Sequence, residues 1–198
     1  MPAVTQEYFD ALPSSLQYAR GVLSANSSPL KLSSLESILK ELSISEEEAL
    51  SIARFDPERY FRLRVLKTEA LEVLLLGWLP GQSSPLHNHR GSNCGVRVLS
   101  GRGFEISFEH SACGLLAPTE IKYFGVGEVA VSAPVDVHQV GNAEQQPLVT
   151  LHVYTPPLSN FDQYSESDTV LSAAPRRAPV PPLHLEQSAK LSAPISSL

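Results

Sequence analysis

Three histidines in this chain have a spacing that would allow them to share one metal ion. His87 and His89 flank a single asparagine, and residues two apart in a β-strand point to the same face. His138 lies in a second strand-like run about fifty residues later, and strands distant in sequence can be neighbours in a barrel. Neutral imidazoles suit zinc, iron, nickel or copper, so ligand type alone does not choose the metal.

This set of three histidines contains no carboxylate. Open coordination positions would therefore remain on the metal, which is typical of a catalytic site rather than of a closed structural one. The competing interpretation is that the histidine pair has no common role, since a His-x-His pair by itself is a weak signal.

A second group of polar side chains lies further along the chain. Thr150, His152 and Tyr154 alternate with Leu151 and Val153, so in a strand the three polar residues share one face. If that face points inward, the three side chains need hydrogen-bond partners, because unpaired buried polar groups are costly. The alternative is that the polar face meets solvent while the apolar face forms the core, and the spacing leaves both open.

Two arginines could recognise an anionic substrate. Arg62 and Arg64 lie two residues apart in a run of period two, so they share a strand face. A guanidinium is a planar fork that matches a carboxylate in two-point contact. Spacing does not say which of the two does so, and an ordinary surface arginine is the competing interpretation.

The first part of the chain is predicted to be helical. Apolar residues recur at helical spacing between Ser34 and Leu42. Ser45 followed by Glu48 is a capping-box signature, which predicts a helix that runs toward Phe55. Pro57 would mark its end.

From residue 60 onward the pattern changes to short strands. The segment Ser100-Gly101-Arg102-Gly103 is predicted to form a tight hairpin. Many short strands separated by turn signals indicate a β-sandwich or barrel. After an initial strand over residues 60–65, the apolar runs are 71–79, 94–99, 103–108, 119–126, 128–133, 136–140 and 147–154.

These patterns divide the chain into three parts. Residues 1–58 would form an N-terminal helical region packing on the barrel, and residues 59–164 the β-barrel itself. Residues 165–198, rich in proline and serine, would form a C-terminal tail without a periodic pattern.

Composition excludes several classes of protein. The net charge of −6 provides no basic face for nucleic acid. No apolar run approaches the roughly 18–20 residues that span a bilayer, so no membrane partner is expected. Cys94 and Cys113 are the only cysteines, and the N-terminus lacks the regions of a signal peptide. We expect a cytoplasmic location in a reducing compartment, and a monomer.

The first histidine pair lies in a segment that resembles the first cupin motif. Gly81, His87, His89 and Gly101 match its spacing, while Cys94 stands where cupins commonly carry a glutamate. Replacing that glutamate converts a three-histidine-one-glutamate site into a three-histidine site. A second cupin motif is matched more loosely, by Gly127, Pro134, His138 and Asn142.

The same residues, with Tyr60-Phe61-Arg62 and the run from Thr150 to Pro157, resemble the cysteine dioxygenases, thiol dioxygenases of the cupin superfamily. The resemblance spans residues 55–158, and the run at 150–157 is its most specific part. It implies a mainly β cupin fold, a double-stranded β-helix that forms a small barrel, with N-terminal helices. Leu63 and Asn93 depart from residues that are frequent in the family.

The resemblance also implies an activity, the oxidation of L-cysteine by O2 to cysteine sulfinate in cysteine catabolism. It implies that Fe(II) is bound by three histidines and that Cys94 lies where family members form a thioether crosslink to tyrosine. The implied roles are His87, His89 and His138 for iron, Arg62 and Tyr60 for substrate, and Tyr154, His152 and Thr150 beside the iron.

Three alternatives remain at this point. The first is a dioxygenase of another small thiol such as 3-mercaptopropionate, although relatives with that preference tend to carry glutamine where this chain has Arg62. The second is a non-catalytic cupin that binds a metal or small ligand, which would leave the run at 150–154 unexplained. The third is a cupin isomerase or zinc-dependent enzyme, against which Cys94 and the missing motif glutamate count.

Overall fold

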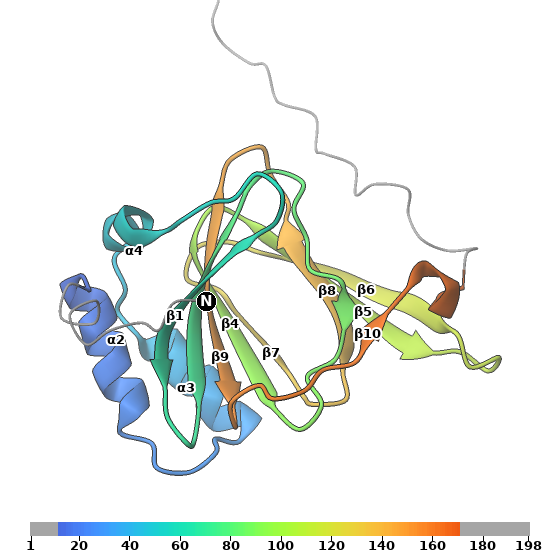
Figure 1. The fold of residues 1–198 in the computed structure, drawn as a ribbon, viewed down its shortest axis with the longest axis horizontal. Helices are drawn as coiled ribbons and strands as arrows, with labels where there is room; N and C mark the ends of the chain where they lie inside the picture. Colours follow the sequence, from blue (N-terminus) through green and yellow to red (C-terminus); the bar gives the residue numbers. More distant parts are fainter. Residues whose placement is uncertain (1–11, 171–198) are drawn as a thin grey trace, which may run out of the picture.

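A computed structural model describes residues 12–170, in which three helices precede two antiparallel β-sheets (Figure 1). The first eleven residues of the predicted helical region, and the predicted tail from residue 171 onward, lie outside the described residues. The helices are α2 (Ser14–Ser24), α3 (Leu32–Glu41) and α4 (Glu46–Ile52). The strands are β1 (Phe61–Lys67), β2 (Glu72–Trp78), β3 (Leu86–His87), β4 (Asn93–Ser100), β5 (Gly103–His110), β6 (Leu116–Phe124), β7 (Val129–Ser132), β8 (Val137–Asn142), β9 (Leu148–Thr155) and β10 (Gln163–Tyr164).

Helix α4 begins at the predicted cap. The Ser45 side chain accepts a hydrogen bond from the Glu48 backbone N–H at 3.3 Å, and three glutamates occupy the first turn, where the helix dipole favours them. The second half of the predicted capping box is absent, because the Glu48 carboxylate accepts from the Ser15 N–H of α2 at 2.7 Å instead. Helix α4 ends at Ile52 rather than continuing toward Phe55.

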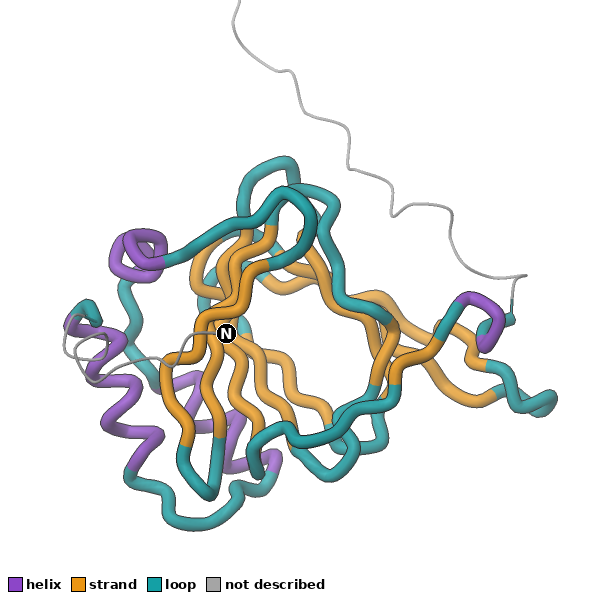
Figure 2. Tube along the Cα trace, viewed as in Figure 1, coloured by secondary structure: helices purple, strands orange, loops and turns teal. Residues whose placement is uncertain are grey.

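The two sheets have five strands each, in the orders β1-β2-β9-β4-β7 and β10-β3-β8-β5-β6. They face each other as the two walls of a small barrel (Figure 2). Strand β9 pairs with β2 on one side and with β4 on the other, although both precede it by many residues. The predicted fold class, a mainly β double-stranded β-helix with N-terminal helices, is confirmed.

The predicted hairpin at residues 100–103 is wrong. The turn there is tight, with Gly101 at a φ of 80°. Among the strands of residues 12–170, however, β4 pairs with β7 and β9, β5 pairs with β6 and β8, and the two do not pair with each other. The chain therefore crosses from one sheet to the other at this turn. A side chain at Gly101 would also meet the Pro147 carbonyl oxygen, 2.7 Å from an ideal Cβ, so a close approach of two turns requires glycine here.

The helices cover the outer face of the first sheet (Figure 1), and the main apolar core lies between the helices and this sheet. Leu35 and Leu39 of α3 approach the sheet so closely that a Cβ on Gly95 would lie 2.5 Å from a Leu39 methyl carbon. A second, smaller core, which includes Trp78 and Tyr154, belongs to the inner face of the same sheet. Within residues 12–170 no helix has the length and apolar character needed to cross a bilayer.

Candidate active site

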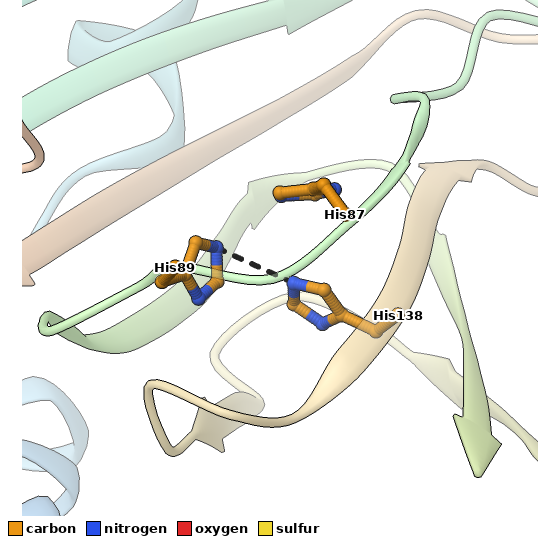
Figure 3. A group of neighbouring side chains, drawn as sticks. All are labelled: His87, His89 and His138. Carbon is orange, nitrogen blue, oxygen red and sulfur yellow. Dashed lines mark hydrogen bonds between the residues drawn. The ribbon is translucent and has the colours of Figure 1, made fainter. Parts of the chain in front are cut away.

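The three predicted histidines converge at the inner wall of the second sheet (Figure 3). His87 ends β3 and is paired in register with His138 of β8, so the ladder itself brings these two rings together. His89 lies beyond the end of β3, in the following loop, and not in a common strand with His87 as the spacing argument assumed. One ligand atom from each ring lies within 4.8 Å of the others.

The orientation of the rings fits one metal ion. The Nε2 atoms of His89 and His138 face each other at 3.4 Å. Two metal–nitrogen bonds of about 2.1 Å meeting at a tetrahedral angle hold their nitrogens about 3.4 Å apart. Nδ1 of His87 lies 2.9 Å from the Pro85 carbonyl oxygen, and Nδ1 of His138 contacts the Glu105 carboxylate. In His87 and His138, Nδ1 therefore donates outward, and Nε2 keeps its lone pair for a metal.

Burial keeps these imidazoles in the form that binds metals. Loss of hydration, together with the neighbouring His138 ring, lowers the pKa of His87 to about 4. The same two causes lower the pKa of His89 further. Both rings are accordingly neutral near pH 7, and no proton must leave before they coordinate.

The histidines open onto a pocket of about 230 Å³. This is smaller than the roughly 300–1,000 Å³ typical of sites for drug-sized ligands, and it suits a small molecule. Apart from the three histidines, its walls are formed by Tyr60, Arg62, Leu76, Trp78, Ser84, Pro85, Cys94, Val96, Val140, His152, Tyr154, Leu158, Phe161 and Gln163.

The two candidate arginines differ in their surroundings. Arg64 is exposed, and its Nε donates to Glu72 at 2.7 Å. Arg62 lines the pocket, and within residues 12–170 its guanidinium has neither a hydrogen bond nor an ion pair. Its positive charge lowers the pKa of His152 and also opposes the rise in the pKa of Tyr154, so the guanidinium acts on the interior of the site. A cation that faces a pocket without a partner is available to an anionic ligand.

The polar face of β9 points into the barrel and forms one chain of contacts. The indole Nε1 of Trp78 donates to the Thr150 hydroxyl at 2.9 Å. That hydroxyl lies 3.0 Å from Nε2 of His152, and Nδ1 of His152 lies 3.5 Å from the Tyr154 hydroxyl. Tyr60 stacks on Trp78, with ring centroids 4.3 Å apart.

The direction of this chain follows from donor and acceptor counts. The Trp78 indole can only donate, so Thr150 accepts from it and has its own proton left for Nε2 of His152. His152 then carries its proton on Nδ1 and donates toward Tyr154. Burial lowers the pKa of His152 to about 3 and raises that of Tyr154, so the imidazole is neutral and the phenol keeps its proton. That phenol proton is not used within this chain of hydrogen bonds.

Cys94 is buried beside Tyr154. The two residues are direct cross-strand partners on β4 and β9, and both are at most 5% exposed. Burial raises the pKa of the Cys94 thiol above its ordinary value, and hydrogen bonds with Ser132 and Tyr154 oppose that rise. The thiol is therefore protonated near pH 7, with the phenol within hydrogen-bond reach.

Sequence reasoning missed two groups that support the site. Glu105 lies in an apolar run without a local signal, and its contact with His138 spans 33 residues. The indole of Trp78 reaches Thr150 across 72 residues. The segment that follows β9 also contributes, because Leu158, Phe161 and Gln163 line the pocket.

Comparison with known proteins identifies relatives of this chain. The family described as "Cysteine dioxygenase type I" matches residues 31–167. The chain is 25% identical over 146 residues to cysteine dioxygenase type 1 of Danio rerio, covering 69% of this chain and 73% of that protein. It is 26% identical over 138 residues to the human protein of that name, covering 65% and 68%.

A solved structure is also similar. It is that of an uncharacterized conserved protein with a double-stranded β-helix domain from Klebsiella pneumoniae. That chain is 23% identical, with a TM-score of 0.47, and the match covers 62% of this chain and 91% of that one.

Proposed function

Because the chain belongs to the cysteine dioxygenase type I family and is a thiol dioxygenase, we propose that its substrate is L-cysteine and its metal is Fe(II). The reaction adds both atoms of O2 to the cysteine sulfur and gives cysteine sulfinate, two oxidation steps above the thiol. His87, His89 and His138 would hold the metal.

One observation carries the choice of substrate, namely the guanidinium of Arg62, which lines the same pocket as the three histidines and has no hydrogen-bond or ion-pair partner among residues 12–170. A small thiol that also has a carboxylate can place its sulfur at the histidines and its carboxylate at Arg62. A two-point contact between guanidinium and carboxylate fixes orientation as well as adding binding energy.

When bound, Fe(II) would supply a centre on which a soft thiolate and O2 meet, together with the redox chemistry that joins them. The role of Arg62 is to orient the substrate so that its sulfur, rather than its carboxylate, reaches the three histidines. The apolar walls at Leu76, Val96 and Val140 exclude water around the sulfur and strengthen the charge contact of Arg62.

Tyr154 would act as a hydrogen-bond donor to oxygen that gains negative charge during the reaction. The chain of contacts from Trp78 through Thr150 and His152 would hold the phenol in position with its proton available for this role. Because burial raises the pKa of Tyr154, the proton stays on the phenol near pH 7 and stabilises charge without leaving permanently.

We further propose that Cys94 and Tyr154 form a thioether. The bond would join Sγ to a ring carbon with loss of the thiol hydrogen and one ring hydrogen, a two-electron oxidation in which O2 takes up both hydrogens and leaves as hydrogen peroxide. Their positions as buried cross-strand partners support this. We expect a faster-migrating species on a denaturing gel that Cys94→Ser abolishes, and an unchanged doublet in this variant would contradict the crosslink.

The test of the substrate is oxygen uptake by the iron-loaded protein, with mass analysis of the product. We expect one O2 consumed per L-cysteine and a mass gain of two oxygens. Arg62→Gln should raise the KM for L-cysteine at least about tenfold, because a charge-assisted pair worth roughly 1.5–3 kcal/mol is lost. Cysteamine, which lacks a carboxylate, should be affected far less.

Arg64→Gln is the matched control, because it removes an arginine from the same strand outside the pocket. Equal losses for L-cysteine and cysteamine in Arg62→Gln would reject the carboxylate role. Turnover of 3-mercaptopropionate with none of L-cysteine would keep the metal chemistry and overturn the proposed substrate.

A further inference from the structure

The three candidate ligands differ in what supports the far side of each ring. Nδ1 of His87 has a neutral backbone carbonyl, that of Pro85. Nδ1 of His89 is buried and has no hydrogen-bond partner among residues 12–170. Nδ1 of His138 contacts a carboxylate, that of Glu105. The site therefore has one ligand with a charged support and two without.

Glu105 reaches His138 through the ladder between β5 and β8. Ser107 is the direct partner of His138, and Glu105 lies two residues away on the same face of β5. Its side chain is only 12% exposed, and a carboxylate this buried is costly unless it is paired. The neighbouring Lys122 on β6 is bound instead to Glu120 at 2.8 Å. In the described part of the chain, the hydrogen bond to His138 is the one that Glu105 makes.

We propose that Glu105 is a positioning residue for the metal centre, which fixes the His138 tautomer and makes His138 the most electron-rich of the three ligands. The inference rests on the proposed function only in requiring that the three histidines bind a metal. An outer carboxylate that accepts from Nδ1 raises the basicity of Nε2 and locks the ring orientation.

This arrangement also places a negative charge near the metal without occupying a coordination position. Cys94 stands where many cupins carry a glutamate that binds metal directly. Glu105 contacts a ligand histidine and not the metal position itself. Its negative charge is therefore retained near the metal, while the coordination position of the missing glutamate stays open for substrate. The site thus keeps a carboxylate, but this carboxylate contacts the far side of the His138 ring instead of the metal.

The variants Glu105→Met and Glu105→Gln separate the two parts of this role. Methionine has similar size and removes both the acceptor and the charge, whereas glutamine keeps an acceptor oxygen and removes only the charge. Glu109→Gln is the matched control, an exposed glutamate at the end of the same strand. Metal-free protein is titrated with Co(II) without oxygen, and the affinity and the visible Co(II) bands are recorded. The Fe(III)/Fe(II) potential is measured on separate samples loaded with iron.

We expect Glu105→Met to bind Co(II) about 10- to 100-fold more weakly than wild type, with shifted Co(II) bands. Glu105→Gln should lose less affinity, but its iron potential should rise, because a negative charge that favours the ferric state is gone. Glu109→Gln should match wild type in all three measurements. A purely structural role would lower the unfolding temperature of the metal-free variants and leave the bands and the potential unchanged.

Wild-type affinity and bands in Glu105→Met would overturn the inference. If that variant does not fold, an unchanged iron potential in Glu105→Gln overturns it equally, because glutamine preserves the shape of the side chain. A wild-type protein that binds neither Co(II) nor Fe(II) would overturn the proposed function as well, so the two failures are distinguishable.

Discussion

Strand β9 is buried on both faces, and the two faces have opposite chemical character. Toward the helices it presents Val149, Leu151 and Val153, which lie in the larger apolar core. Toward the pocket it presents Thr150, His152 and Tyr154, which are at most 5% exposed. The same backbone therefore separates a mainly apolar interior from one that depends on polar contacts.

The difference shows how this fold separates stability from chemistry. On the helix face, contacts are non-directional, and their contribution scales with the apolar area buried. On the pocket face, each polar group is held by a specific partner, and the loss of one partner changes the proton position of the next. Variants on the two faces should therefore change different observables, and four predictions test that division.

The largest effect is expected from removing a ligand on the pocket side. His89→Ala should lower bound iron and reduce kcat/KM by more than the roughly 100-fold associated with losing an outer hydrogen-bond partner. The unfolding free energy of the metal-free protein should change little by comparison. Metal analysis and oxygen uptake measure this, with the exposed His110→Ala as control. Full activity in an iron-depleted variant would contradict the mechanism.

The next effect is on the helix face. Leu151→Ala should lower the unfolding free energy by about 2–5 kcal/mol, because it leaves a cavity in a core where Leu151 is 1% exposed. The protein that remains folded should keep its kcat, since Leu151 does not line the pocket. Urea unfolding and kinetics at low temperature measure both quantities. A large fall in kcat per folded molecule would show that the two faces are coupled.

Thr150→Val keeps the shape of the side chain but deletes the hydroxyl. It should lower both kcat and the free energy of unfolding, each by less than the two variants above. It leaves Trp78 Nε1 and His152 Nε2 without their partner, which should lower the free energy of unfolding by about 1–3 kcal/mol. The His152 tautomer is no longer fixed, so kcat should fall on the order of 10- to 100-fold. Thr150→Ser keeps the hydroxyl and should behave like wild type. Equal kcat values for the valine and serine variants would refute the directed chain.

The last effect, which changes stability and not turnover, concerns pH. The pKa of His152 is about 3 in the folded chain and about 6.5 when unfolded. Between these values the unfolded chain binds a proton that the folded chain does not. The free energy of unfolding therefore falls as the pH drops below about 6.5, and this residue does not change it above that pH. The slope from this residue is about 1.4 kcal/mol per pH unit. Urea unfolding of metal-free His152→Gln at pH 7 and 5 should show a correspondingly weaker pH dependence, and an unaltered slope would refute it.

Much of the site could be predicted because its spacing is local. The alternation of Thr150, His152 and Tyr154 indicated a shared face, and periodicity left open only whether that face was buried. Three helices covering the opposite face decide this, since Leu151 and Val153 then pack outward against them. A pattern within one strand cannot reveal which element covers its other side.

Long-range contacts account for what could not be predicted. His89 lies in a loop next to Asn88, whose backbone N–H donates to Asp162 and whose side chain donates to Asp162 and Tyr164, all more than seventy residues away. The turn at Gly101 was recognised as tight, but turn chemistry does not say which sheet the next strand joins. Glu105 and Trp78 became part of the site only through strands that pair far along the chain.

The position of β9 has a consequence for how the molecule assembles. Strands β2 and β4 are separated in the first sheet by a strand that is synthesised some fifty residues after β4. Until β9 emerges from the ribosome, both keep unpaired hydrogen-bonding edges, which are templates for association with other chains. Its insertion closes the sheet late, through contacts of high sequence separation, and such topologies fold slowly. A ribosome-bound chain that ends before β9 should accordingly be prone to aggregate, whereas one that extends past β10 should not.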